Sequence, residues 1–533
     1  MTLFPSFRDE WVLHQGGGLL VLDKPAHVPA QAPDGQDDDL PSRAKSHLGL
    51  SYLGVHQRLD AATSGVLAYT TAPERNRDFA EGLKSAEKRY VACVDSFRGK
   101  GGRLEHWLAP RSGGGSVVST KNDARAKRAV THVEVLRRQG ERALLRLRIE
   151  TGRTHQIRVQ LAEVGSPIAG DTLYGSNPAT PGRLMLHAES LHVEGQTFTS
   201  PVPSSFDTFL DGGAMDLAEL VRVAAQRRFA LAKSPDTTAY RLFHGEGEGA
   251  PGVSVDVYGK YLLLHLRSEE AHAQETDIAE ALRTFSAEFA GLYVKRRPKQ
   301  ANEKSGDKRE LAPPEPLWGD AIGEFEVREN GLVYNVDLSR GLSTGIFLDQ
   351  RRARARVRKD ASGARVLNLF AYTCPFGVAA AAGGAGEVIN VDSSATALGR
   401  GKTNFERNHL SGRVLKNDAF EYLERCVRKG ERFDWVLCDP PTYATGKKRR
   451  WKSGAQWKEL ATLCARVSAR GGRLLLSSND SRMSQSRFRR YVREGVEGAG
   501  RRLVAMRDGK GDRDFPVAPS DEPLPRRLWL VLD

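Results

Sequence analysis

The sequence has few cysteines and no long apolar run. Its 533 residues include 5 cysteines, namely Cys93, Cys374, Cys426, Cys438 and Cys464. They are too few and too scattered for a disulfide framework or a cysteine-based metal site. No apolar stretch approaches the roughly 18 residues that span a bilayer, and residues 1–5 do not read as the start of a signal peptide. We therefore expect a cytoplasmic protein with no membrane contact and no metal.

Acidic residues are outnumbered by basic ones. Lys and Arg total 80 against 66 Asp and Glu, which gives a net charge of +14 and a pI near 9.5. Such an excess favours a polyanionic partner, and nucleic acid is the first candidate. A net positive charge can also serve solubility alone, so the charge does not by itself establish a nucleic-acid partner.

The chain is long for one hydrophobic core, and its patterns predict three domains. Residues 1–210 carry many short strand patterns and few long helices, which indicates an α+β fold with a mixed, mainly antiparallel sheet. Residues 217–325 form a small α+β unit. Residues 331–533 alternate apolar strands with helices, which is typical of a doubly wound, Rossmann-like α/β sheet that binds ligands at the carboxyl ends of its strands.

A first group of candidate catalytic residues lies in residues 1–210. Arg58 and Asp60 stand beside the turn Thr63-Ser64-Gly65. A carboxylate on such a loop is a candidate nucleophile or general base, although a local Asp–Arg pair is the simpler reading. Three further segments accompany it in order, at residues 88–90, 152–158 and 167–175.

Together with residues 22–25, these motifs resemble the RluA family of RNA pseudouridine synthases over residues 17–205. The resemblance implies conversion of uridine to pseudouridine with no cofactor. Asp60 would be the catalytic carboxylate and Arg153 the guanidinium that keeps it ionised. Tyr90 would pack on the target uracil, and Arg58 would fill the gap left when the uridine flips out of the RNA. Gln57, where relatives often have His, puts some RNA contacts in doubt.

A second group follows the predicted parallel strands. Residues 368–377 join a strand to a helix, Asp392 closes the next strand, Asp418 follows a third element and residues 439–443 read Asp-Pro-Pro-Thr-Tyr. An acid at the end of the second strand usually binds ribose hydroxyls. Taken singly, Asp392 and Asp418 could be helix N-caps.

This order resembles class I S-adenosylmethionine-dependent methyltransferases. With residues 341–351 and the 217–325 unit, it resembles the RlmI and RlmKL group of 23S rRNA methyltransferases. The resemblance implies that Asp418 meets the adenine of S-adenosylmethionine. The methionine and ribose portions would be held by Phe370, Tyr372, Thr373, Gly377 and Asp392, and Asp439 would also contact the cofactor. The target base would be held by Asp439, Pro440, Pro441 and Tyr443.

The cysteine positions bear on the methylated atom. Methylation of cytosine C5 needs a thiolate that adds to the ring. Relatives that modify cytosine have a cysteine after the fourth strand, where this chain has Ser477-Ser478-Asn479-Asp480. Guanine N7 needs no such activation and is favoured, while an exocyclic amine and cytosine C5 stay as alternatives.

A basic run after the base-binding loop suggests contact with RNA. It comprises Lys447, Lys448, Arg449, Arg450, Trp451 and Lys452. A solvated surface is the alternative reading. We expect a bifunctional RNA-modification enzyme that acts on 23S rRNA or a ribosomal assembly intermediate. The alternatives are the same fusion acting on tRNA, and an RNA-binding assembly protein with one degenerate half.

Overall fold

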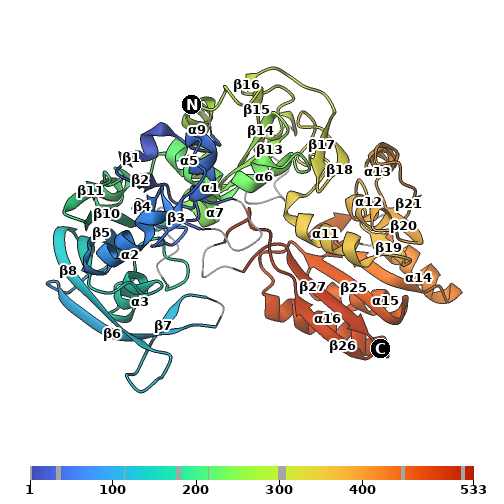
Figure 1. Cartoon of the computed structure of the whole chain (residues 1–533). Coiled ribbons are helices and arrows are strands. Elements are labelled where there is room, and N and C mark those ends of the chain that lie inside the picture. Colours follow the sequence, from blue (N-terminus) through green and yellow to red (C-terminus); the bar gives the residue numbers. More distant parts are fainter. Residues whose placement is uncertain are drawn as a thin grey trace.

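The computed structural model describes residues 3–31, 38–112, 114–175, 182–213, 215–297, 308–445, 450–517 and 522–533. Three large sheets follow one another along the chain. In Figure 1 they form an arc, with the first sheet on the left, the second at the top and the third on the right.

The first sheet is mixed and mainly antiparallel, and it has 11 strands. Its order is β1 (Val12–Gly16), β2 (Leu19–Lys24), β4 (Ser64–Thr70), β10 (Leu186–Val193), β5 (Glu87–Val94), β9 (Arg142–Ile149), β8 (Lys127–Gln139), β6 (Gly102–Pro110) and β7 (Ser116–Ser119). Strand β3 (Gly54–Val55) pairs with β4, and β11 (Gln196–Thr199) pairs with β10. Its helices are α1 (Leu40–Leu48), α2 (Asn76–Ser85), α3 (Gln156–Glu163) and α4 (Ser205–Leu210).

The second sheet has 5 strands, in the order β12 (Ala239–His244), β13 (Val253–Tyr258), β14 (Tyr261–Leu266), β15 (Gly291–Arg296) and β16 (Trp318–Gly319). Strands β14 and β15 are parallel, and the other pairs are antiparallel. The helices are α5 (Leu217–Arg227), α6 (Phe229–Lys233), α7 (Gly245–Glu248), α8 (Glu269–Ala273), α9 (Glu275–Arg283) and α10 (Lys308–Leu311). The hairpin of β17 (Phe325–Glu329) and β18 (Leu332–Val336) leads to the third sheet.

The third sheet has 7 strands, in the order β21 (Arg413–Lys416), β20 (Glu387–Asp392), β19 (Arg365–Leu369), β22 (Phe433–Cys438), β25 (Ser468–Ser478), β27 (Arg526–Leu532) and β26 (Leu503–Asp508). The first five are parallel, and β27 and β26 are antiparallel. The strand order reverses at β19, because β20 and β21 lie on one side of it and β22 and β25 on the other. The carboxyl ends of β19, β20 and β22 therefore surround the crevice where such sheets bind ligands.

Helices cover both faces of this third sheet. One core contains residues of α14 (Ala419–Lys429), α15 (Gln456–Arg466) and α16 (Gln485–Gly498). The opposite core contains residues of α11 (Arg351–Asp360), α12 (Pro375–Ala382) and α13 (Ala395–Arg407), together with Tyr258, Leu263 and Tyr293 of the second sheet. The second and third sheets therefore share a core.

The N-terminus also joins two units. Leu3 and Phe4 are buried in the core of the second sheet, where the ring of Phe4 meets that of Tyr240 at 6.5 Å. Phe7 instead belongs to the core beneath β2 and β4 of the first sheet. The start of the chain thus bridges the first two units.

Candidate active sites

Asp60 lies on a turn whose backbone is tightly held. The Thr63 amide donates to the Asp60 carbonyl at 3.0 Å, and strand β4 begins at Ser64. The Nζ atom of the buried Lys24 donates to the Ala61 carbonyl at 2.9 Å and also to the carbonyls of Pro25 and Val28. Burial lowers the pKa of Lys24 to about 7. The carboxylate is thereby presented from a fixed loop.

The turn ends at Gly65, where the backbone passes close to strand β10. Its φ is +110°, and a Cβ there would meet the backbone oxygen of Ala188 at 2.2 Å. Strands β4 and β10 run parallel at this point, with Gly65 opposite Ala188. Only glycine allows this close approach without strain, so the Thr-Ser-Gly pattern fixes the turn against the sheet.

The partner expected for Asp60 was wrong. Arg158 donates from Nη1 to Oδ2 of Asp60 at 3.0 Å, and its Nε and Nη2 donate to the buried carboxylate of Asp171 at 2.7 and 2.8 Å. Arg153 donates from Nε to the Arg128 carbonyl at 3.1 Å. The reason is geometric, because Arg153 precedes helix α3 whereas Arg158 points from it into the protein. The Asp60 side chain keeps 24% of its surface exposed.

His155 also faces Asp60, as sequence reasoning did not predict. Its Nε2 lies 3.6 Å from Oδ1 of Asp60, and its Nδ1 lies 3.1 Å from the hydroxyl of Tyr174. Burial lowers the pKa of His155, which favours the neutral ring. The signals for Arg158, His155 and Asp171 were present, since all three lie inside the motifs at 152–158 and 167–175.

The four predicted residues of the first group line one cavity of about 600 Å³. Asp60, Tyr90, Arg58 and Arg153 all contribute to its wall, beside Arg158 and His155. Tyr90 is half-buried on β5, whereas Arg58 is exposed at the rim. A cavity of this size holds a nucleotide. The motifs are therefore brought together as expected, with a different arginine at the carboxylate.

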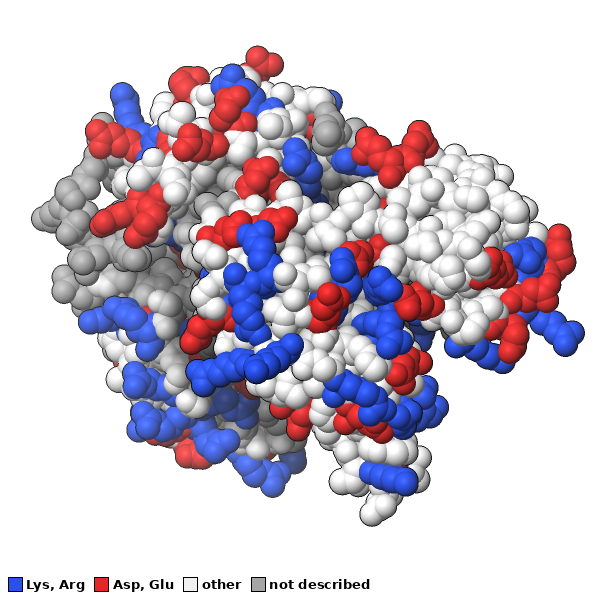
Figure 2. Space-filling model, turned by 90° about the vertical axis from the view of Figure 1, so that its left-hand side faces the viewer, with Lys and Arg blue, Asp and Glu red and all other residues white. Residues whose placement is uncertain are grey.

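Basic side chains accompany this cavity. Exposed Lys and Arg residues of strands β6 to β8 and their connections include Arg103, Arg111, Lys121, Arg125, Lys127 and Arg128. The hydrogen bond from Arg153 to the Arg128 carbonyl joins these strands to the cavity wall. In the face shown in Figure 2, Lys and Arg gather in the lower half, with Asp and Glu mixed among them.

A second cavity, of about 250 Å³, lies at the carboxyl ends of the strands of the third sheet. Five of the predicted cofactor-binding residues line it, namely Phe370, Tyr372, Asp392, Asp418 and Asp439. Asp392 accepts hydrogen bonds from the amides of Tyr372 and Ser394, both at 2.8 Å. Asp418 caps helix α14 by accepting from the amides of Phe420 and Glu421. Both acids thus shape the backbone of the cavity they line.

Thr373 and Gly377 do not line this cavity. The buried hydroxyl of Thr373 donates to the Gly345 carbonyl. A Cβ at Gly377 would meet Oδ1 of Asn390 at 2.0 Å. Gly377 therefore lets helix α12 approach strand β20, which is a packing role. Both residues support the loop at 370–374.

Asp439 follows strand β22 and faces the second cavity. Gln350 donates from Nε2 to Oδ2 of Asp439 at 2.9 Å and to the Ser477 hydroxyl at 2.8 Å. Burial raises the pKa of Asp439 to about 6, against the opposing effect of its hydrogen bonds with Ser477 and Gln350. Pro440 and Pro441 line the cavity beside it, and Tyr443 is 47% exposed on strand β23 (Tyr443–Thr445).

The prediction that Trp451 contacts RNA was wrong. Trp451 lies on β24 (Arg450–Lys452), is only 3% exposed and belongs to the core beneath α14 and α15. Its Nε1 donates to the Pro441 carbonyl at 2.7 Å, and its ring meets that of Phe420 at 5.8 Å. A large apolar ring gains more from this burial than from an exposed position. Trp451 also lines the second cavity, which is called the cofactor cavity below because the predicted cofactor residues line it.

The rest of the predicted basic run is only partly described. Lys447, Lys448 and Arg449 lie outside the described residues, as does the side chain of Arg450. Lys452 is exposed. Of the two described side chains in this run, Lys452 is the one that is exposed and free to meet RNA.

All five cysteines are buried free thiols. Burial raises the pKa of Cys374 to about 12, and it also raises the pKa of Cys438 well above its usual value. Within the described residues, no cysteine lines the cavity that contains Asp439. The same part of the chain shows no group of three metal-ligating side chains, and none of its helices is long and apolar enough to cross a bilayer.

Comparison with known proteins assigns both halves. Residues 18–163 match the family model for RNA pseudouridylate synthase, and residues 240–494 match that for S-adenosylmethionine-dependent methyltransferase. Ribosomal RNA large subunit methyltransferase I of Aeromonas salmonicida is 33% identical over 366 residues, which cover 66% of this chain and 88% of that protein. The chain belongs to the ribosomal RNA large subunit methyltransferase I family.

A further relative and a solved structure are similar to the same part of the chain. The protein of that name from Escherichia coli is 31% identical over 329 residues, which cover 61% of this chain and 81% of the relative. The crystal structure of SMU.776 with bound SAH is 29% identical, has a TM-score of 0.53 and covers 59% of this chain and 80% of that one.

This member of the methyltransferase I family therefore carries an additional N-terminal catalytic domain. It is a bifunctional RNA-modification enzyme, with a pseudouridine synthase fold followed by an S-adenosylmethionine-dependent methyltransferase. The expected fold classes and enzyme classes are confirmed. The residues of the second cavity suit S-adenosylmethionine, since they offer carboxylates for ribose and amine groups and aromatic rings for the adenine.

Proposed function

We propose that Asp60 is the catalytic carboxylate for the conversion of uridine to pseudouridine in RNA. The observation that carries this proposal is the fixed ion pair of Asp60 with Arg158 inside a nucleotide-sized cavity. The guanidinium favours the ionised carboxylate, which can attack or abstract a proton. Tyr90 would pack on the uracil, and Arg58 at the rim would occupy the space of the flipped nucleotide.

Release of tritium from uridine labelled at C5 tests this role. The variant Asp60→Asn should lose at least about a thousandfold in rate, because the amide is neither a nucleophile nor a base. Methyl transfer by the same variant is the control for folding and should be unchanged. Equal tritium release by the wild type and Asp60→Asn would overturn the assignment.

For the C-terminal half, we propose methylation of guanine N7 in 23S rRNA or an assembly intermediate. The names of the relatives support a large-subunit rRNA target. Support for N7 comes from the cysteines, because a thiolate nucleophile for cytosine C5 would need an accessible thiol of low pKa. Cys374 and Cys438 are buried with raised pKa values, and Ser477 stands beside Asp439.

In this proposal the target base lies against Asp439, Pro440, Pro441 and Tyr443. S-adenosylmethionine would supply a methyl group on a sulfonium sulfur, which would leave as a neutral thioether as the lone pair of N7 displaces it in line. These four residues would contribute by positioning the base, which supplies most of the rate. Cleavage of rRNA by borohydride and aniline tests the atom, because that treatment breaks the strand at N7-methylguanosine and leaves 5-methylcytidine intact. Cleavage should occur in rRNA from wild-type cells and disappear in cells that lack the protein. Loss of 5-methylcytidine instead would overturn the N7 assignment.

A further inference from the structure

A third cavity, of about 510 Å³, lies between the second sheet and the methyltransferase. It shares five lining residues with the cofactor cavity, namely Ser343, Phe347, Asp349, Tyr372 and Asn479. The two cavities therefore adjoin. A molecule in the third cavity would reach the cofactor across Phe347 and Tyr372.

Two arginines of the second sheet line this cavity. Arg267 directly follows strand β14. Arg297 directly follows strand β15, whose last residue is Arg296. These strands are parallel, with Leu266 opposite Arg296. Neighbouring strands lie about 4.8 Å apart, so the second sheet delivers both guanidinium groups to the same edge.

Neither arginine has a carboxylate within hydrogen-bond distance in the described part of the chain. Arg267 donates to the Ser254 hydroxyl at 2.6 Å, and the nearest Glu246 oxygen is 3.8 Å away. Arg297 donates from Nη2 to the Leu342 carbonyl at 2.6 Å, while its buried Nε has no hydrogen-bond partner. The Arg267 side chain is 33% exposed, so a ligand can reach it.

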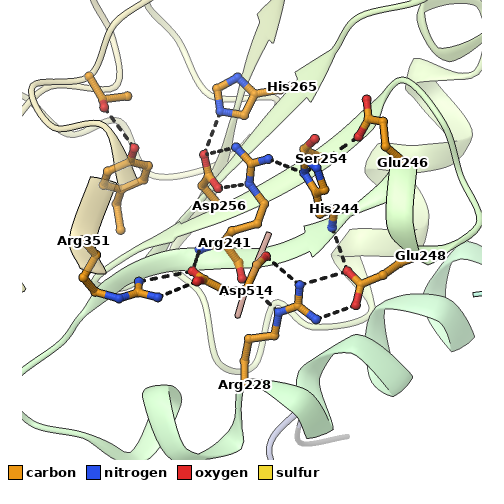
Figure 3. A network of polar contacts seen from close by, with 12 residues as sticks. Arg228, Arg241, His244, Glu246, Glu248, Ser254, Asp256, His265, Arg351 and Asp514 are labelled. Atoms are coloured by element: carbon orange, nitrogen blue, oxygen red, sulfur yellow. Dashed lines mark hydrogen bonds and ion pairs between the residues drawn. The ribbon is translucent and has the colours of Figure 1, made fainter. Parts of the chain in front are cut away.

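The nearby Asp256 is already committed. Figure 3 shows its carboxylate between Arg241 and His265. Arg241 donates to both oxygens of Asp256, and His265 contacts one of them at 2.9 Å. Burial and the charges of Arg241 and Arg297 lower the pKa of Arg267 to about 10, which leaves it protonated at pH 7. The hydrogen bonds of Asp256 thus go to Arg241 and His265.

Two of the residues that this cavity shares with the cofactor cavity, Phe347 and Asp349, suit a base. Phe347 is 41% exposed, and its ring meets that of Tyr372 at 5.3 Å. An exposed aromatic ring at the mouth of a cavity is a stacking platform for a nucleobase. Asp349 lines both cavities, and its Oδ1 has no hydrogen-bond partner among the described residues. A carboxylate there can accept hydrogen bonds from the edge of a base.

We propose that this cavity holds the nucleotide to be methylated, with its phosphate on Arg267 and Arg297 and its base reaching past Phe347 to Asp439 in the adjoining cavity. This inference rests on the proposed base methylation and adds the direction in which the nucleotide lies in the cavity. Two guanidinium groups bind the phosphate through charge-assisted hydrogen bonds. The base then points toward Asp439 and the cofactor, so the second sheet selects a phosphorylated strand rather than a free base.

Equilibrium dialysis of guanosine 5′-monophosphate and guanosine against the full chain, loaded with S-adenosylhomocysteine, tests the proposal. The wild type should bind the monophosphate at least about tenfold more tightly than guanosine, as expected for charged hydrogen bonds. Arg267→Gln and Arg297→Gln should each remove most of this preference. Equal binding of the two probes by the wild type would overturn the proposal.

Two further variants keep the test specific. Phe347→Ala should weaken both probes by a similar factor and leave the preference for phosphate unchanged. Arg283→Gln removes the same charge from α9, where the exposed Arg283 pairs with Glu280, and should change neither affinity. If Arg283→Gln lowered the preference as much as Arg267→Gln, general electrostatics would explain the result and the site would be refuted.

The two levels of the proposal fail separately. If S-adenosylhomocysteine did not bind the full chain, the proposed methyltransferase function would fail. If it bound, and the phosphate preference was absent, only the present inference would fail. Pseudouridine formation by Arg267→Gln and Arg297→Gln should equal that of the wild type, which reports that both variants fold.

Discussion

Arg153 and Arg158 belong to the same motif, yet only Arg158 reaches Asp60. A motif read from sequence gives order and residue type, but the direction of a side chain depends on where a helix begins. His155 has a φ of +54° and precedes the first residue of α3, so the chain turns sharply between the two arginines. Sequence reasoning therefore found the correct motif and assigned the ion pair to the wrong member of it.

The variant Arg158→Lys should slow pseudouridine formation by about a hundredfold, because a single ammonium cannot hold Asp60 and Asp171 together and small misplacements cost that much. The effect should fall on kcat. Arg153→Lys is the matched control, and it should change mainly KM, since Arg153 lines the cavity without contacting the carboxylate. Single-turnover measurements on labelled RNA separate the two. A kcat loss confined to Arg153→Lys would restore the original assignment.

Asp439 gives methyl transfer a predicted dependence on pH. Its pKa is raised to about 6, so the carboxyl group is increasingly neutral below pH 6 and can no longer accept hydrogen bonds from the base with full strength. The value of kcat/KM should therefore fall with decreasing pH, with a midpoint near 6. Gln350→Leu removes a donor to the ionised form, so its midpoint should move upward by up to about one pH unit.

Pseudouridine formation by Gln350→Leu is the control for this measurement and should keep the wild-type pH profile. A midpoint for methyl transfer that stays the same or moves downward in Gln350→Leu would show that Asp439 does not govern the profile.

The regular elements were largely predictable where apolar periodicity is strong. The apolar strands predicted within residues 331–533 include β19, β20 and β22, and the strand-to-helix junction predicted at 368–377 joins β19 to α12. Patterns of this kind report the buried face directly. They do not report which elements meet, so the cavity between the second and third sheets could not be foreseen.

Strand β24 shows how a local reading fails. A Trp within a basic run looks like a nucleic-acid contact, because sequence does not reveal that the hairpin of β23 and β24 turns the ring toward α14 and α15. The same residue type serves either role, and tertiary packing decides between them. The contacts that decided it here, with Phe420 and with Trp457 at 5.5 Å, involve residues distant in sequence or on another element.

Trp451→Ala should therefore destabilise the methyltransferase half by about 3–5 kcal/mol, as for other buried aromatic truncations, and should weaken S-adenosylmethionine binding. Urea unfolding followed by near-ultraviolet circular dichroism measures the first effect, and calorimetry the second. Lys452→Ala, at the exposed neighbouring position, should stay within about 0.5 kcal/mol of the wild type. Weaker RNA binding by Trp451→Ala with unchanged stability would support the surface role instead.

The two catalytic halves are joined by more than a linker. The guanidinium of Arg43 lies 3.7 Å from the ring centroid of Phe229, and Arg227 contacts both His27 and Glu248. On the other side, the buried Arg228 pairs with Glu248 and donates to the Asp514 carbonyl, while Asp514 pairs with Arg351 (Figure 3). The unit that contains the second sheet thus contacts both the first and the third unit through charged side chains. The apolar periodicity of the sequence does not predict such contacts.

Phe4 and Phe7 allow a sharp test of how the chain start connects these units. Phe4 packs in the core of the second sheet and Phe7 in the core of the first, although few residues separate them. Each truncation to Ala removes a buried ring and should cost about 3–5 kcal/mol in its own unit. Phe4→Ala should lower the urea midpoint for loss of S-adenosylmethionine binding more than that for loss of pseudouridine formation. Phe7→Ala should show the reverse order, and equal shifts in both activities for both variants would mean that the two units unfold as one.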